Sequence, residues 1–160
     1  MAVSHVEKFA PTHKSSRDLP WTPFTPYSDQ VFLQLFHVDF VRGSSVLMLR
    51  APGGAGLGVH DHYGALMVYT VQGEWHYEEH DWTSKPGDFV YEVANSKHTF
   101  VADPGDDVLL FIAIEGAISF IGENDEVVGI ETAHTFAQRY EDYCNEHGLE
   151  VVDLTKFSRS

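Results

Sequence analysis

Three histidines lie in two separate stretches of the chain, at spacings that suit a metal ion. His60 and His62 begin the stretch from residue 58 to residue 75, and His98 lies in the stretch from residue 85 to residue 103. Both stretches are rich in apolar, β-branched and aromatic residues, which is typical of strands. Because side chains of a strand alternate between its faces, His60 and His62 point to the same side and can bind one ion. We therefore expect metal binding by His60, His62 and His98.

The alternative is that these histidines are ordinary surface or hydrogen-bonded residues. A chain with 10 histidines produces some His-x-His pairs by chance. The context favours the metal site, because Gly73 and Gly87 provide turns where the strands must reverse. His37 lies alone in an earlier strand pattern and is not included in the site.

The two stretches resemble the paired motifs of the cupin superfamily. In that family a His-x-His hairpin closed by a glycine is followed by a Gly-Asp turn and, eleven positions after the turn glycine, by another histidine. Gly73 and Gly87 match the two glycines, and the three histidines match the metal ligands. Cupins with a fourth, carboxylate ligand carry it shortly after the second histidine, where this chain has Leu66. The resemblance therefore implies a three-histidine site without an acidic ligand.

A narrower resemblance, to the 2,4'-dihydroxyacetophenone dioxygenases, rests on the run EWHYEEHDWTSKPGDFVYEVANSKHTF. The later run EGAISFIGENDEVVGIETA is similar to the end of the related acetylacetone dioxygenases. In both families three histidines hold an iron that helps O2 to cleave a carbon-carbon bond beside a ketone, and a glutamate precedes the third histidine by six residues. Glu92 stands at that position. The resemblance thus implies Fe2+, with Zn2+ or Ni2+ as possible ions in the purified protein, and a ketone substrate with O2.

Glu92 is the expected catalytic residue. If it is buried near the metal, we expect a raised pKa and a role in accepting the substrate proton or in holding a ligand histidine. A surface position on a strand is the alternative. Phe100, two residues after His98 and on the same face, is expected to contact the substrate.

The segment from residue 74 to residue 80 alternates, and the sequence leaves open which face looks inward. If the even-numbered face does, His76 binds the substrate, and Glu78 or His80 can also join the site. If the odd-numbered face does, the even positions form a solvated strand surface.

Three neutral imidazoles bind iron, zinc, copper and nickel, so the ligand set alone does not identify the metal. With a divalent ion they leave a site charge near +2, which favours an anionic substrate such as an enolate. We predict a mononuclear non-heme iron dioxygenase that cleaves a carbon-carbon bond of a β-diketone or α-hydroxyketone with O2.

Two alternative functions remain. One is a zinc-dependent hydrolase or lyase, in which zinc lowers the pKa of a bound water to about 7. The other is a non-enzymatic module that senses a metal or ligand, like the one at the end of certain anti-sigma regulators.

Many short strands and one late helix indicate an all-β fold, for which a jelly-roll barrel is the natural closed form. The resemblance makes this a cupin-type double-stranded β-helix. We expect an irregular arm over residues 1–30 and a single cupin domain over residues 31–160. The spacing of apolar residues predicts a C-terminal helix over 133–147, with Thr132 as its N-cap and Gly148 at its end.

The chain has 160 residues and a formal net charge of −14, which argues against nucleic-acid and anionic-membrane partners. No apolar run approaches the ~20 residues of a membrane span, and the start of the chain lacks the pattern of a signal peptide. We therefore expect a cytoplasmic location. An exposed strand edge and an aromatic N-terminal arm favour a homo-oligomer, either a dimer or a tetramer.

Overall fold

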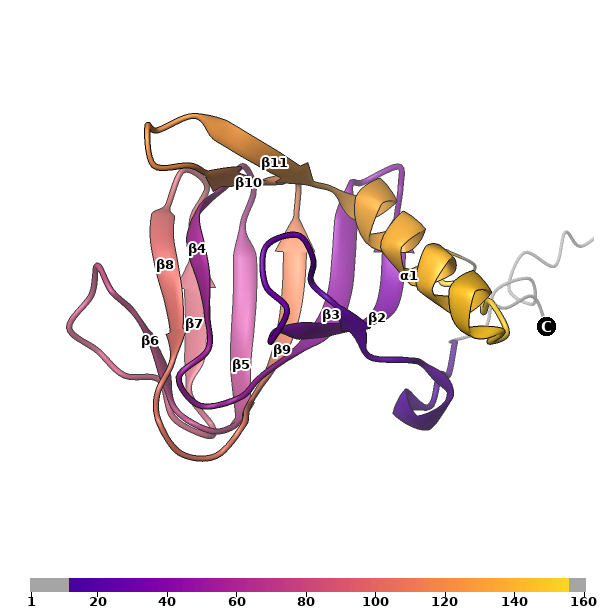
Figure 1. Ribbon diagram of the computed structural model, residues 1–160, viewed down its shortest axis with the longest axis horizontal. Helices are drawn as coiled ribbons and strands as arrows, with labels where there is room; N and C mark the ends of the chain where they lie inside the picture. The colour runs from indigo at the N-terminus through magenta and orange to yellow at the C-terminus, as the bar shows by residue number, and fades with distance from the viewer. Residues whose placement is uncertain (1–11, 156–160) are drawn as a thin grey trace, which may run out of the picture.

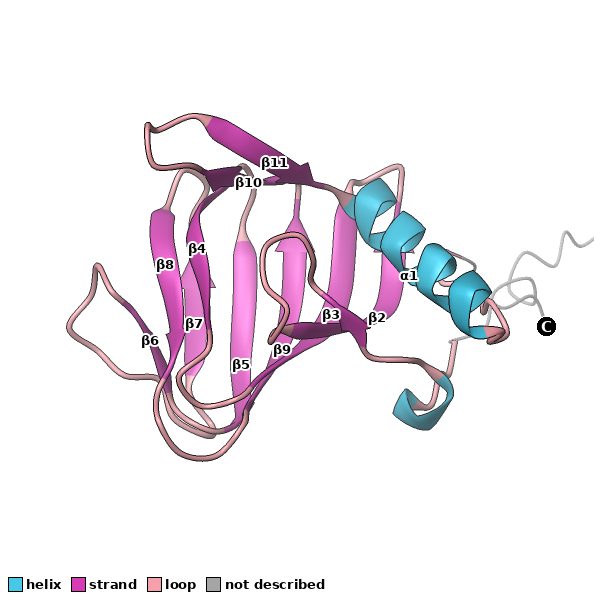
Figure 2. Cartoon of the chain, viewed as in Figure 1, coloured by secondary structure: helices cyan, strands magenta, loops and turns pink. Residues whose placement is uncertain are grey.

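The protein folds into two antiparallel β-sheets that face each other, with one long helix near the C-terminal end (Figures 1 and 2). The computed structural model describes residues 12–155. The predicted all-β jelly roll with a single late helix is confirmed. The first eleven residues of the predicted arm and the last five residues of the chain lie outside the described part.

The strands divide between a six-stranded and a five-stranded sheet. In spatial order, the six-stranded sheet consists of β1 (Thr22–Pro23), β2 (Phe32–Asp39), β3 (Ser44–Ala51), β9 (Val108–Glu115), β5 (Leu66–Gln72) and β7 (Phe89–Glu92). The five-stranded sheet consists of β11 (Val127–Glu131), β10 (Ile118–Ile121), β4 (Gly56–His62), β8 (Lys97–Ala102) and β6 (Trp75–Tyr77). The strands β7 and β6 are therefore the last strands on one side of their sheets.

The core lies between the two sheets because every second side chain of the long strands is apolar and points inward. In β3 and β9 buried positions alternate strictly with more exposed ones. Leu47, Leu110 and Ile112 are among the buried side chains. This alternation fixes the register, since a slip of one residue would turn the apolar set toward solvent.

The N-terminal segment is less irregular than its sequence suggests. A short 3-10 helix, η1 (Ser16–Asp18), precedes β1, and β1 pairs with β2 at the edge of the six-stranded sheet. After this strand, Phe24 enters the core with only 3% of its surface exposed. Part of the segment expected to be an arm thus belongs to the barrel.

Helix α1 (Ala133–His147) covers one end of the barrel (Figure 1). Its bounds agree with the predicted helix. The Thr132 side chain accepts a hydrogen bond from the backbone N–H of Thr135, and Gly148 ends the helix with a φ of 65°, which a glycine adopts without strain. No helix of the described residues has the length and apolar character that crossing a membrane requires.

Candidate metal centre

The three predicted histidines come together on the inner face of the five-stranded sheet. Strand β4 lies between β8 and β10, and its His60 stands directly opposite His98 of β8. His62 follows two residues later and shares the inward face. All three side chains are buried, and one ring nitrogen from each lies within 4.8 Å of the others. This spacing allows one metal ion to contact all three rings.

Burial keeps two of these histidines in the form that binds metals. Desolvation lowers the pKa of His60 to about 4 and that of His62 to about 3, so both rings are neutral at pH 7. The Nδ1 of His60 lies 2.8 Å from the carbonyl oxygen of Gly58. As the donor of that bond, Nδ1 carries the proton, which leaves the lone pair of Nε2 free for a cation.

Glu92 reaches the histidines from the opposite sheet. It is the last residue of β7, is buried, and places its Oε2 3.1 Å from Nε2 of His98 and 3.3 Å from Nε2 of His62. Its other oxygen, Oε1, accepts a hydrogen bond from the hydroxyl of Tyr77.

The pKa of Glu92 differs from the expectation. Burial alone would raise it, as predicted, but the neighbouring His98, His62 and Tyr77 stabilise the carboxylate and lower the pKa below its ordinary value. The expected raised pKa is therefore wrong, because His98, His62 and Tyr77 surround the carboxylate in the folded barrel and their stabilisation of its charged form outweighs desolvation.

Four buried polar atoms of His62, His98 and Glu92 make no hydrogen bond of regular geometry. They are both ring nitrogens of His62, Nε2 of His98 and Oε2 of Glu92. Unpaired buried polar atoms are costly, and native proteins rarely keep them without a reason. A bound cation would satisfy one ring nitrogen of His62 and one of His98. The side chains present therefore fit a divalent metal held by three histidines. The set of mutually close ligand atoms does not include Glu92.

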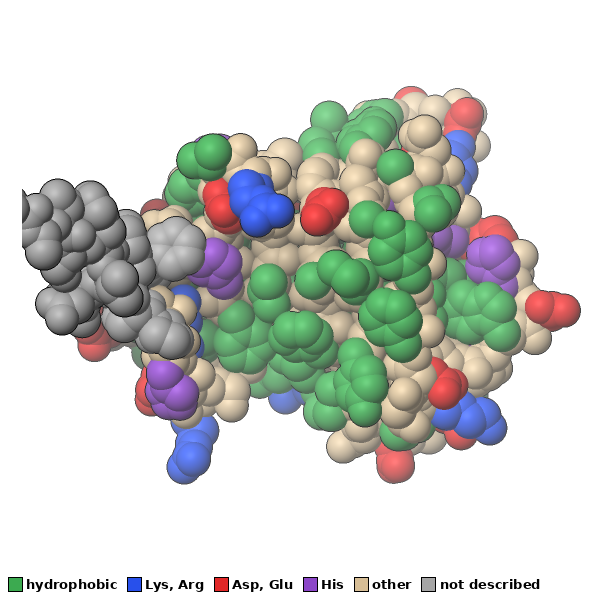
Figure 3. Space-filling model, turned by 180° about the vertical axis from the view of Figure 1, so that it is seen from behind, with side chains coloured by type: hydrophobic (Ala, Val, Ile, Leu, Met, Phe, Trp, Pro, Cys, Tyr) green, Lys and Arg blue, Asp and Glu red, His purple; other side chains and the backbone are tan. Residues whose placement is uncertain are grey.

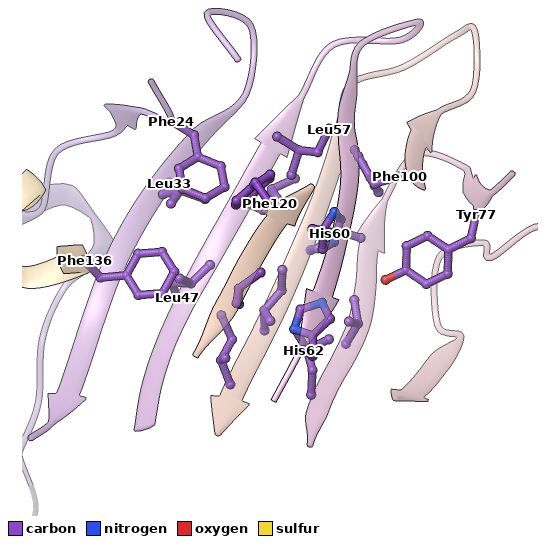
Figure 4. A pocket seen from close by; sticks show the side chains of 17 residues that line it. Phe24, Leu33, Leu47, Leu57, His60, His62, Tyr77, Phe100, Phe120 and Phe136 are labelled. Atoms are coloured by element: carbon purple, nitrogen blue, oxygen red, sulfur yellow. The ribbon is translucent and has the colours of Figure 1, made fainter. Parts of the chain in front are cut away.

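An apolar cavity adjoins the histidines (Figure 4). Its volume is about 50 Å³, on a measure by which one water needs roughly 10–15 Å³. His60, His62 and Tyr77 lie at one side of it, and the aromatic residues Phe24, Phe100, Phe120 and Phe136 line it together with leucine, isoleucine and valine side chains. Phe100, expected to contact the substrate, is thus placed at this cavity.

A second, larger pocket of about 570 Å³ reaches the centre from outside. Its lining includes His98 and Glu92 together with residues of β7 and of the loop after β6. Tyr77 lines both cavities and stacks on His98, with ring centroids 3.9 Å apart. The Tyr77 ring therefore stands between the outer pocket and the inner cavity.

The structure does not bring His76 to the three histidines. In the pairing of β6 with β8, Tyr77 stands opposite the inward-facing Phe100 and His76 opposite Val101, so the odd-numbered face looks inward. His76 instead pairs with Asp103 on the outer side, at 2.7 Å from Nδ1 to Oδ1, and 31% of its side chain is exposed. This corrects its expected place at the substrate.

The two neighbours of His76 on the even-numbered face also lie away from the metal ligands. Glu78 is exposed, and His80 stacks on Trp82 at the outer pocket. The sequence analysis missed Tyr77, although a tryptophan and a tyrosine at positions 75 and 77 were a signal that the odd face is the apolar one.

Comparisons with known proteins agree with this architecture. The profile of a protein family described as the ChrR cupin-like domain matches residues 11–117. An RmlC-like cupin protein from Ralstonia eutropha JMP134 has 37% identity and a TM-score of 0.90, with 94% of this chain and 97% of that chain covered. A search of curated proteins gave no match.

Two more distant structures share the fold at lower identity. An acetylacetone dioxygenase from Acinetobacter johnsonii has 16% identity and a TM-score of 0.75, with 89% of this chain and 99% of that chain covered. The anti-sigma protein ChrR of Rhodobacter sphaeroides, solved in complex with SigE, has 22% identity and a TM-score of 0.52, with 61% of this chain and 49% of that chain covered.

Proposed function

We propose that this chain, which belongs to the ChrR cupin-like domain family, is a mononuclear Fe2+ dioxygenase. The proposed reaction cleaves a carbon-carbon bond of a β-diketone or α-hydroxyketone. The observation that carries the proposal is the convergence of three buried histidines beside an apolar cavity. The acetylacetone dioxygenase with the same fold supports it. The products would be two carboxylic or oxo fragments.

The donor set suits this chemistry. Three neutral imidazoles would leave a divalent first-row ion with its charge near +2, and the adjacent Glu92 carboxylate would reduce the charge of the whole site to about +1, which still attracts an enolate. When bound, Fe2+ supplies a Lewis acid for the ketone oxygens and an electron source for O2. A first-row ion held by His60, His62 and His98 alone would keep coordination positions open for small molecules.

The surrounding side chains have separate tasks in the proposed reaction. The aromatic walls formed by Phe100 and Phe120 bind the apolar ends of the ketone and exclude water. The Oε2 of Glu92 faces the histidines, 3.1 Å from Nε2 of His98, so it is the carboxylate oxygen positioned to accept the proton whose removal creates the enolate. Tyr77 fixes the other carboxylate oxygen through its hydroxyl group.

Metal analysis combined with oxygen uptake tests this proposal. Metal-free protein is reloaded separately with Fe2+, Zn2+ and Ni2+, and O2 consumption is followed with a panel of β-diketones and α-hydroxyketones. We expect ketone-dependent uptake with Fe2+, and a loss of metal in His62→Ala. The variant Glu92→Gln should keep the metal and lose roughly 10²- to 10⁴-fold in turnover. His76→Ala, at a histidine outside the centre, is the matched control and should resemble the natural chain.

A metal- or ligand-sensing module is the second candidate, because the family is named after ChrR and that protein was solved with a sigma factor. Within residues 12–155, however, the one long helix is α1, which packs on the barrel. Zinc in the purified protein with no ketone-dependent O2 uptake by the Fe2+-loaded form would favour this candidate. Turnover without O2 in the zinc form would instead favour a hydrolase or lyase.

A further inference from the structure

The outer face of the six-stranded sheet is apolar where an antiparallel sheet commonly faces water. Six large side chains on β5, β7 and β9 form this apolar sheet face: Met67, Tyr69, Val71, Phe89, Tyr91 and Phe111. Their exposed fractions run from 37% to 60%. The view from behind shows hydrophobic side chains gathered on this side of the molecule (Figure 3).

The strand register makes these side chains one continuous surface. Tyr69 of β5 stands opposite Phe89 of β7 on one side and opposite Phe111 of β9 on the other. Met67, two residues earlier, stands opposite Tyr91. Directly opposed residues have Cβ atoms about 5 Å apart, so their side chains touch across the strands. Tyr69 is therefore the centre of the apolar sheet face.

The area of this face is close to what a stable dimer needs. With large side chains offering roughly 150–250 Å² each, the six exposed fractions amount to roughly 600 Å². That is at the upper limit of the largest apolar patch on a typical monomer, about 300–600 Å². It is also most of the ~800 Å² that each partner buries in a standard interface. The half-buried Leu109 and Ala113 of β9 extend the same face.

The distribution of charge on the surface allows a second copy of this chain to bind at the apolar sheet face. The chain has a net charge of −14, so two copies repel each other over most of their surfaces. The outward positions of β3, β5, β7 and β9 hold one cation and one anion, Arg50 and Glu115, which lie toward opposite ends of the sheet. This face has no net charge, and two copies can approach each other there without repulsion.

We propose that the apolar sheet face packs against the same face of a second copy of this chain, which forms a symmetric dimer. Two sheets that meet face to face lie about 10 Å apart and interleave their side chains. In a two-fold contact the same patch of each copy meets its equivalent, and an apolar face without net charge can pack against itself in this way. The same contact covers the outer side of β7, the strand whose inner side carries Glu92.

Sedimentation equilibrium of the full chain tests the dimer and does not depend on the proposed activity. At micromolar concentration we expect the natural chain to have twice its 18.0 kDa mass. The double variant Tyr69→Lys/Phe89→Lys places two charges at the centre of the face and should weaken association on the order of 10³-fold. Its matched control, Val127→Lys/Ile130→Lys, adds the same charge at two apolar side chains of β11, each 51% exposed, and should remain dimeric.

Circular dichroism and metal content show whether each variant is folded. A folded Tyr69→Lys/Phe89→Lys monomer beside a dimeric control supports the proposal. A natural chain that is monomeric at all concentrations overturns it. So does an assembly that survives the Tyr69→Lys/Phe89→Lys change, or one that the β11 change dissociates, because the interface would then lie elsewhere.

Discussion

Tyr77 links the two parts of the candidate centre, since its ring stacks on His98 while its hydroxyl donates to Glu92. These two contacts have different chemical consequences. The stacked ring restricts the orientation of a proposed metal ligand. The hydroxyl fixes one carboxylate oxygen, so the other is presented to the ring nitrogens of His98 and His62.

Replacement of Tyr77 by phenylalanine separates these contacts. The ring and its stacking remain, but the hydrogen bond to the carboxylate is lost, and bonds to charged groups are among the stronger ones. We expect metal content to stay at the level of the natural chain and kcat for O2 uptake to fall roughly tenfold or more. Tyr143→Phe, at a half-buried tyrosine of α1 that lines neither the inner cavity nor the outer pocket, is the control. A fall in metal content, or an unchanged kcat, would contradict this role.

The pKa values of His60 and His62 predict how acid acts on the metal-free protein. Both folded-state values, about 4 and about 3, lie below the ordinary 6.5. As the pH falls from 6.5 toward these values, His60 and His62 take up protons in the unfolded chain but stay neutral in the folded chain. The free energy of unfolding therefore falls as the pH is lowered from 6.5, by up to about 1.4 kcal/mol per histidine and pH unit.

Urea unfolding of the metal-free protein at pH 7 and pH 5 measures this effect. The natural chain should lose stability between the two values. The variant His60→Phe/His62→Phe should show a flatter dependence, because both titrating groups are gone. Equal pH dependence in the two proteins would show that other groups control it.

At the scale of elements, a buried ion pair fastens helix α1 to strand β11. Arg139 of the helix donates to both carboxylate oxygens of Glu131, from Nη2 at 2.6 Å and from Nη1 at 2.8 Å. The two side chains are 16% and 4% exposed, so little water competes with the pair. The guanidinium also lies over the ring of Phe24, at 4.9 Å from its centroid. One residue thus joins the helix, a strand and the N-terminal segment.

Loss of the Arg139 charge should therefore be costly. Arg139→Met leaves Glu131 buried without its partner, and we expect the free energy of unfolding to fall by about 3–5 kcal/mol. Lys97→Met is the matched control, because the Lys97–Asp125 pair is 47% and 78% exposed and should contribute little to the free energy of unfolding. Denaturant unfolding measures both. A loss at Arg139 no larger than that at Lys97 would contradict the role of the buried pair.

For the whole molecule, the sequence predicted the architecture because its signals are periodic. Alternating apolar residues mark the strands, a change to helical spacing marks α1, and Thr132 with Gly148 marks the ends of that helix. The strand β1 escaped prediction because Pro-rich sequence normally breaks pairing, and β1 pairs for two residues at the sheet edge.

The candidate centre could be predicted only where its residues share a strand or a known motif. His60 and His62 are two residues apart, and His98 follows a recognisable turn. The face of β6 was left open because alternation alone allows either His76 or Tyr77 to point inward, although the two aromatic residues at positions 75 and 77 favoured the odd-numbered face. The lowered pKa of Glu92 depends on how closely His98, His62 and Tyr77 approach its carboxylate in the folded barrel, which the six-residue spacing to His98 alone does not give.

The inner cavity is built from segments far apart in the sequence. The matched family profile covers residues 11–117 and so contains the three histidines. Phe120 and Phe136, which close the cavity on β10 and α1, lie beyond that range. Most of the residues that line this cavity lie within the matched range, and Ile118, Phe120 and Phe136 complete it from β10 and α1. A chain shortened after residue 117 would therefore leave the cavity open on that side, and β4, which carries His60 and His62, would lose β10 as its paired neighbour.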